Sequence, residues 1–292
     1  MLKKFVFVFC FFGAAVNGLW SQDYSAGFRA GLNFARFSGP SETSASGGEL
    51  EEFSNSTGFH IGAAFGITFE ETYGFRGELL YSQKGTQYNY AGESYWILEA
   101  QDNSRLYASG NRTTSLSITN SYIDIPVTAF YKLGRLELSA GVSAGILVGS
   151  RGAGEVIFSG QTATGAAVDP FTIALDLNYF SDGFRRTDID DVEVRTIQGK
   201  TVEIPKTLGA YYQELEGKDQ LFETLDFGLV GGLAFYLNQG LYLGLRMNYG
   251  LSDITKKERD ISRKELDTNN NFILLDDKDR NVNLQASIGF SF

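Results

Sequence analysis

The sequence predicts an all-β fold: a transmembrane antiparallel up-and-down β-barrel of eight strands with long extracellular loops. Three observations predict it. Apolar and polar residues alternate in eight segments, and the connections between those segments are either very short or long. The one long apolar run lies at the N-terminus and is too short to cross a bilayer as a helix.

The N-terminal segment has the composition of an export signal. Lys3 and Lys4 precede an apolar run over residues 5–16, which the polar stretch "NGLWSQ" follows. A basic start, an apolar core and a polar exit are typical of a secretory signal peptide. We therefore expect residues 1–22 to be a cleaved signal peptide and residues 23–292 to form the barrel domain.

Composition excludes several classes of function. Cys10, the only cysteine, lies inside the expected signal, so the exported chain would have no disulfide and no thiol ligand. Without Lys3 and Lys4 the chain has 35 acidic residues and 23 basic ones. Such a surface repels phosphate backbones, so we expect no nucleic-acid partner.

The final strand shows the alternation most clearly. Every second residue of 281–292 is apolar: Val282, Leu284, Ala286, Ile288, Phe290 and Phe292. The same period of two occurs in 28–34, 59–69, 75–82, 123–131, 136–146, 225–237 and 241–250. A terminal strand of this kind would leave an unpaired edge unless it closes on the first strand, as in a barrel.

The connections fall into two groups. Tight turns are expected at 70–73, 132–135 and 238–240, and long polar loops at 38–57, 85–119, 150–222 and 252–280. Short turns at one end and long loops at the other are typical of outer-membrane barrels.

The loop at 150–222 is a long extracellular insertion with its own pattern. Residues 171–180 alternate, and residues 191–204 predict a hairpin around Gln198 and Gly199. These segments form either a folded extracellular crown or two additional strands of a ten-stranded barrel.

The polar face of the strands is predicted to line the lumen. It carries Arg29, Arg76, Glu78, Glu137 and Arg246. An arginine at the midplane of the lipid face would cost about 2–4 kcal/mol, so these side chains belong inside. An eight-stranded lumen has room for little beyond side chains. We therefore expect these charges to pair and to plug the barrel.

Eight glycines accompany the charges on the polar face, in pairs four residues apart. They are Gly27, Gly31, Gly62, Gly66, Gly141, Gly145, Gly228 and Gly232. We interpret them as the small residues that leave room for long side chains from the opposite wall.

Other candidate site residues favour a non-catalytic interpretation. His60, the only histidine, faces inward and stands in no recognisable nucleophile motif, so we expect it to form hydrogen bonds in the lumen. Two acidic clusters lie in the long loops: Asp188, Asp190, Asp191 and Glu193, and then Asp267, Asn269 and Asn271. The second cluster lacks the glycine and glutamate of a calcium loop. We expect no catalytic residue, no cofactor and no bound metal.

Five stretches of the chain resemble the porin-like, or PorT-like, outer-membrane β-barrel family of Gram-negative bacteria. They are "GFRAGLNFARFSG" (27–39), "GFHIGAAFGITFEETYGFRGELLYSQKG" (58–85), "YIDIPVTAFYKLG" (122–134), "LDFGLVGGLAFYL" (225–237) and the terminal Phe strand. The resemblance implies an integral protein of the cell outer membrane, inserted by the barrel-assembly machinery. It also implies that Phe290 and Phe292 act as the assembly signal. The segment 150–222 is longer than the family pattern.

The resemblance implies no single activity, and one branch of the family serves protein secretion. Our functional hypothesis is a non-enzymatic barrel with a plugged lumen, serving envelope structure or surface interaction. It would contact membrane lipid and lipopolysaccharide, the latter through basic residues of 256–264. The alternative is a small pore or a component of a secretion apparatus, which would need an envelope or secretion protein as its partner.

Overall fold

A computed structural model describes residues 22–183, 191–212 and 220–292. The expected signal peptide thus lies outside the described residues, apart from Gln22. No helix in the described part of the chain is long and apolar enough to cross a bilayer. The strands are β1 Gln22–Ser38, β2 Glu51–Phe69, β3 Tyr73–Glu99, β4 Arg105–Leu133, β5 Leu136–Thr162, β6 Ala167–Leu177, β7 Val192–Ile197, β8 Lys200–Pro205, β9 Thr207–Leu208, β10 Leu225–Tyr236, β11 Leu241–Gly250, β12 Ile261–Leu266, β13 Phe272–Leu274 and β14 Arg280–Ser291.

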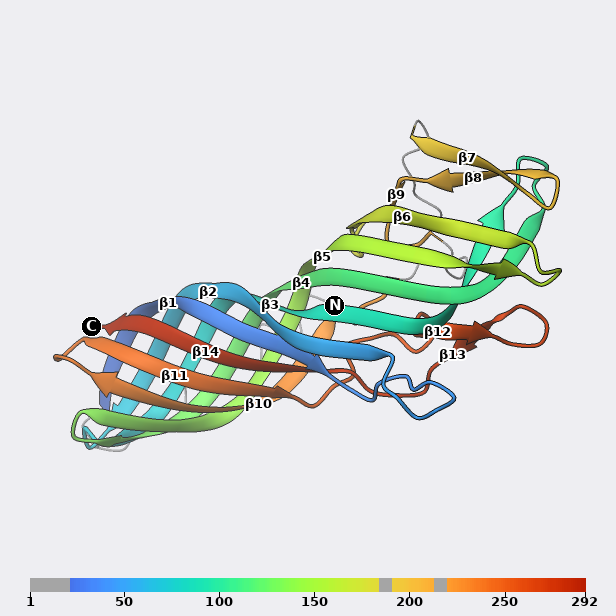
Figure 1. Cartoon of the computed structure of the whole chain (residues 1–292). Helices are drawn as coiled ribbons and strands as arrows, with labels where there is room; N and C mark the ends of the chain where they lie inside the picture. Colours follow the sequence, from blue (N-terminus) through green and yellow to red (C-terminus); the bar gives the residue numbers. More distant parts are fainter. Residues whose placement is uncertain (1–21, 184–190, 213–219) are drawn as a thin grey trace, which may run out of the picture.

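Eight antiparallel strands close into a ring (Figure 1). The order around it is β1, β2, β3, β4, β5, β10, β11 and β14, and β14 returns to β1. At the seam Phe28 lies opposite Phe290, and Ala26 and Phe292 exchange two backbone hydrogen bonds of 2.8 and 2.9 Å. The eight-stranded prediction is therefore confirmed, and the ten-stranded alternative is wrong.

The two faces of the ring differ as the alternation predicts. Outward side chains are apolar and exposed, such as Phe65 at 65% and Val142 at 57%, whereas inward charged side chains such as Glu78 are buried. Lipid would cover the outward face, because a membrane strand satisfies its backbone through its neighbours and needs an apolar exterior.

Three strands continue well beyond the ring, and this differs from the sequence prediction. β3, β4 and β5 are 27, 29 and 27 residues long, so most of the predicted loop at 85–119 is strand. Residues 83–99, 105–121 and 149–162 form, with β6, a curved sheet that we call the outer sheet. β6 pairs with β5 only beyond the ring, which is why it adds no strand to the barrel (Figure 1).

The change from lipid to water at the rim of the barrel explains why the sequence pattern did not predict the outer sheet. On one face of β4, the exposed residues Ile125 and Val127 in the ring give way to exposed Thr113 and Ser115 in the outer sheet. The strand period persists while the outward residues change from apolar to polar. A β-bulge between β4 and β5 at Ser121/Tyr122 marks this transition at the rim.

The outer sheet has its own apolar core. Trp96, Phe158 and Phe171 pack together with ring centroids 5.2–5.7 Å apart, and β8 covers them with Val202 and Ile204. The predicted hairpin is confirmed as β7 and β8. Its turn residues Gln198 and Gly199 have φ values of 55° and 73°, as a tight two-residue hairpin turn requires.

Candidate functional site

The charged layer nearest the short turns consists of Arg76 and Glu137. Arg76 Nη1 and Nη2 donate to Glu137 Oε1 and Oε2 at 2.6 and 2.9 Å. The Tyr236 hydroxyl donates to the same carboxylate at 3.0 Å, and the guanidinium lies 4.8 Å from the centre of the Phe130 ring. Both charged side chains are buried, and a bidentate pair with a third donor satisfies the carboxylate.

The next layer is centred on Glu78. Arg246 donates to both of its oxygens at 2.8 and 2.5 Å, and Arg29 Nη1 approaches both at 3.4 Å. Two cations therefore share one carboxylate. Arg29 also donates from Nη2 to the Ser287 hydroxyl at 2.6 Å.

A third layer lies toward the outer sheet and was not predicted as part of the network. Lys84 Nζ donates to Asp124 at 3.0 Å and to Asp226 at 3.1 Å. Asn281 donates to Asp226 at 2.9 Å, and the ammonium group of Lys84 lies 4.6 Å from the centre of the Tyr122 ring. Two anions here share one cation, which reverses the imbalance around Glu78.

The three layers together balance their charges. The five predicted residues are three cations and two anions, and the third layer adds one cation and two anions. The alternation had placed Asp124 and Asp226 inward, so their contribution was readable from the sequence. Lys84 was missed because the predicted strand stopped at Ser82, two residues too early.

Little free space is left beside these layers. Two cavities in this part of the lumen measure about 10 Å³ each, which is about the space for one water molecule. A Cβ atom added at any of the eight inward glycines would lie within 3.0 Å of a neighbouring atom. At the outward Gly77 and Gly231 such an atom would meet nothing within 4 Å.

His60 belongs to a buried hydrogen-bond chain. Its Nδ1 lies 2.7 Å from Asn33 Oδ1 and its Nε2 lies 2.9 Å from Ser287 Oγ. The Asn33 amide nitrogen donates to the Ser82 hydroxyl and to the backbone carbonyls of Phe59 and Gln83. Asn33 Oδ1 is thus an acceptor, which makes His60 Nδ1 the donor and Nε2 the acceptor from Ser287.

This order of serine, histidine and asparagine matches the nucleophile, base and orienting group of some hydrolases. Here Ser287, His60 and Asn33 are 7%, 1% and 0% exposed. Arg29 also donates a hydrogen bond to the Ser287 hydroxyl oxygen. The two lumen cavities do not include Ser287 or His60 in their walls. These side chains therefore form part of the buried hydrogen-bond network of the lumen.

The predicted acidic clusters lie outside the lumen. Asp188 and Asp190 fall outside the described residues. Asp191 pairs with Lys206 and Glu193 with Arg195, both on the β7–β8 hairpin or next to it. The carboxylate of Asp267 accepts hydrogen bonds from the backbone of Asn269 and Asn271, so it caps the turn between β12 and β13.

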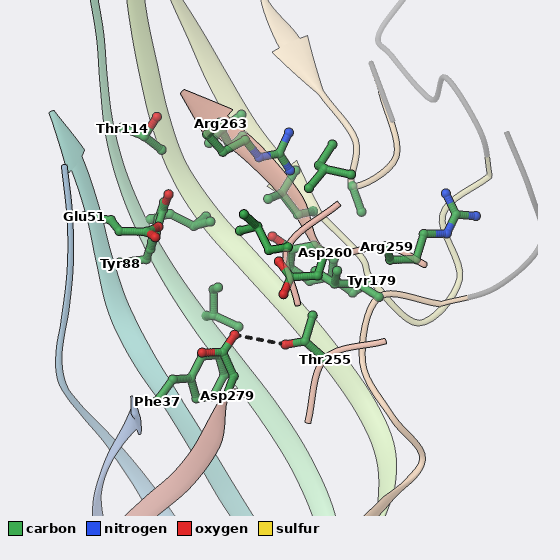
Figure 2. A pocket seen from close by; sticks show the side chains of 18 of the residues that line it. Phe37, Glu51, Tyr88, Thr114, Tyr179, Thr255, Arg259, Asp260, Arg263 and Asp279 are labelled. Carbon is green, nitrogen blue, oxygen red and sulfur yellow. Dashed lines mark hydrogen bonds between the residues drawn. The ribbon is translucent and has the colours of Figure 1, made fainter. Parts of the chain in front are cut away.

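A larger cavity, of about 210 Å³, lies between the outer sheet and residues of the segments 208–212, 221–222 and 255–279. We call it the outer cavity (Figure 2). Its apolar wall includes Phe37, Leu116, Ile118, Leu177 and Phe222. In Figure 2, Arg263 and Thr114 lie toward one end, and Phe37, Thr255 and Asp279 toward the other. No sequence motif indicated it, because its walls come from distant segments.

Acidic side chains line one part of the outer cavity. Oxygens of Asp260, Asp277 and Asp279 lie within 4.8 Å of one another. Burial, with the neighbouring aspartates, raises the pKa of Asp260 to about 8 and that of Asp279 to about 7. Asp260 and Asp277 share a hydrogen bond, and Asp279 accepts one from Thr255 at 3.3 Å. The carboxyl group of Asp260 is therefore largely protonated at neutral pH, and that of Asp279 is partly protonated.

The basic residues of 256–264, considered as contacts for lipopolysaccharide, are partly used within the protein. Arg259 is 4% exposed, lines the outer cavity and lies 5.3 Å from the Tyr211 ring centre. Lys257 pairs with Asp276 at 2.7 Å and Lys264 with Glu93 at 3.6 Å.

Comparison with solved structures finds outer-membrane proteins. Ail of Yersinia pestis, in complex with the heparin analogue sucrose octasulfate, is 12% identical, covering 92% of this chain and 99% of Ail at a TM-score of 0.35. Neisserial surface protein A is 12% identical; the match covers 93% of this chain and 99% of that protein at a TM-score of 0.32. OprG from Pseudomonas aeruginosa is 12% identical; the match covers 93% of this chain and 97% of OprG at a TM-score of 0.32.

No curated protein matches the sequence. The model of one protein family, described as the outer membrane protein beta-barrel domain, matches residues 20–256. That match spans most of the chain and most of the closed ring described above. This chain belongs to the outer membrane protein beta-barrel domain family.

Proposed function

We propose that this outer-membrane protein is a non-conducting barrel that holds a folded sheet at the cell surface and acts through surface interaction. The observation that carries the proposal is the filled lumen. Four cations and four anions pair within it, and the neighbouring cavities hold about one water each. An ion crossing this lumen would have to displace buried ion pairs, which costs several kcal/mol.

The position of the outer sheet supports the second half of the proposal. In outer-membrane barrels the short turns face the periplasm and the long connections face outward. The outer sheet continues from the end opposite the short turns, so it would stand outside the cell (Figure 1). Its outer surface exposes Thr113, Ser115, Arg151 and Glu155, which suits contact with water and with polar partners.

Single-channel recording in planar lipid bilayers tests the proposal. The unmutated protein is expected to give no steady conductance. The triple variant Arg29→Ala, Glu78→Ala, Arg246→Ala removes the central layer without leaving an unpaired charge there, and it should also remain closed, because the layers of Arg76 and of Lys84 still fill the lumen. Steady conductance from the unmutated protein would contradict the proposal and favour the alternative role as a small pore or secretion component.

A further inference from the structure

We propose that the outer cavity binds a small apolar carboxylate and that Arg112 holds its carboxylate group. This inference deepens the surface role proposed above and rests on the outer sheet lying outside the membrane. The cysteine-labelling experiment described in the Discussion tests that placement separately, so the two can fail independently.

Arg112 is the observation that carries the inference. Its side chain lines the outer cavity from β4 and is only 7% exposed. Nη2 donates to the backbone carbonyl of Tyr95 at 3.0 Å, and Nε has no hydrogen-bond partner. Among the described residues no carboxylate forms an ion pair with it. A buried guanidinium without an anion is costly, and a bound carboxylate would remove that cost.

The surroundings of Arg112 strengthen its preference for an anion. The guanidinium lies 5.1 Å from the Trp96 ring centre, and Arg263 also lines the cavity. Burial, with the positive charge of Arg263, lowers the pKa of Arg112 to about 10, so it remains charged at neutral pH. A planar guanidinium beside an aromatic ring is a common binding surface for carboxylates.

Most of the acidic groups that line the cavity already have hydrogen-bond partners within the protein. Glu51 accepts hydrogen bonds from the Glu42 backbone and from the Tyr88 hydroxyl. Asp260 bonds to Asp277, and Asp279 accepts from Thr255. In the part of the chain that the structure describes, Asp277 Oδ1 has no hydrogen-bond partner, but Asp277 shares a hydrogen bond with the neighbouring Asp260. Arg112 has no anion beside it there and no partner for Nε, so an anionic ligand fits better than a cationic one.

The apolar wall sets the size of the ligand. A cavity of 150 Å³ lined by aliphatic and aromatic side chains is large enough to bind benzene. The outer cavity measures about 210 Å³, and Leu116 and Ile118 follow Arg112 and Thr114 along the same face of β4 toward the ring. One aromatic ring with a short carboxylate arm would reach from these apolar residues to the guanidinium.

Calorimetric titration of the full-length protein in lipid nanodiscs tests the inference. Three probes share one apolar body: 4-phenylbutyrate, 4-phenylbutanamide and 4-phenylbutylamine. The carboxylate should bind at least about tenfold more tightly than the amide, because a charged hydrogen bond to a buried arginine is lost in the amide. Empty nanodiscs correct for partition into lipid.

Two variants and one control variant test whether Arg112 contacts the carboxylate of the ligand. Arg112→Gln should reduce carboxylate affinity to that of the amide, while Arg151→Gln, an exposed arginine on the opposite face of the outer sheet, should change nothing. Leu116→Phe fills the cavity with Arg112 intact and should weaken all three probes. It keeps the inference testable if Arg112→Gln fails to fold.

Three results would overturn the inference. The first is equal affinity of the carboxylate and the amide for the unmutated protein, or no binding of either. The second is tighter binding of the amine, which would assign the cavity to cations. The third is a carboxylate preference that survives in a folded Arg112→Gln variant.

Discussion

Arg76 on β3 reaches past β4 to Glu137 on β5 and holds it through two hydrogen bonds of 2.6 and 2.9 Å. Among the described residues Arg76 is the only cation paired with Glu137. Glu78 differs, because it has both Arg246 and Arg29 as partners. Two buried carboxylates in one lumen thus depend on their arginines to different degrees.

This difference predicts unequal losses of stability. Arg76→Ala leaves Glu137 with only the Tyr236 hydroxyl and should cost about 3–5 kcal/mol, as expected for an unpaired buried charge. Arg246→Ala leaves Glu78 beside Arg29 and should cost about 1.5–3 kcal/mol, the value of a charged hydrogen bond. Denaturant unfolding of the protein in detergent measures both, with Arg151→Ala as the surface control. Equal losses of stability in the two variants would contradict the conclusion that Glu137 and Glu78 lie in separate layers with different numbers of arginine partners.

The inward glycines give a second prediction. Gly62→Ala places a methyl group against the backbone of Leu79 and Leu80 and should destabilise the barrel by about 1–3 kcal/mol, a typical cost of overpacking. The same change at the outward Gly77 meets nothing within 4 Å and should be neutral or slightly stabilising. If both substitutions lower the unfolding midpoint equally, the cost arises from backbone conformation, and contact with the neighbouring strand β3 is not its cause.

The sequence predicted the ring well and the outer sheet poorly, for one physical reason. A strand in lipid must expose apolar residues, so segments such as 136–146 show an unbroken alternation of apolar with polar or small residues. Beyond the rim the outward positions of β4 are largely polar, as at Thr113, while the inward positions mix polar and apolar types, as at Thr114 and Leu116. The period is then hidden, and the sequence resembles a polar loop.

The outer cavity was unpredictable for a different reason. Arg112 lies within a stretch predicted as loop, and its environment depends on Trp96, Arg263 and segments far away in the chain. The lumen charges were accessible because each strand of a barrel alternates independently of its neighbours. Their partners still required the register, since Glu78 could have paired with any of the three arginines.

Assembly should depend on the two terminal phenylalanines, which remain a predicted assembly signal. Phe290 lies on the outward face, 6.1 Å from the ring centre of Phe28 on β1, and Phe292 closes the seam with Ala26. Phe290→Ala together with Phe292→Ala should reduce the assembled fraction in cells and increase unfolded protein in the periplasm. Heat-dependent migration on a denaturing gel separates the two forms, and Leu237→Ala on the outward surface serves as control. Normal assembly of the double variant would refute the signal.

Cysteine labelling should establish which end of the barrel faces outward. A single cysteine at Asp102, between β3 and β4 in the outer sheet, should react with a membrane-impermeant maleimide on intact cells. A cysteine at Asn238, in the short turn after β10, should react only after the outer membrane is permeabilised. Replacing Cys10 removes the one native thiol. The opposite pattern would place the outer sheet in the periplasm and remove the basis of the surface role.

The protonated aspartates of the outer cavity should make the outer sheet less stable as pH rises. Burial raises the pKa of Asp279 from 3.8 to about 7, and that of Asp260 from 3.8 to about 8. Between about pH 4 and pH 8 the folded state therefore binds protons that the unfolded chain releases, so stability falls as pH rises through this window and is level above it.

The fluorescence of Trp96, the only tryptophan outside the expected signal peptide, reports on this region, because its side chain lines the cavity. Its thermal transition should shift downward from pH 5 to pH 8. Asp279→Asn, which keeps a hydrogen-bond acceptor for Thr255, should flatten that dependence, and Asp169→Asn on the exposed surface should leave it unchanged. A transition that rises with pH, or one that Asp279→Asn does not alter, would show that these carboxyl groups are ionised in the folded protein.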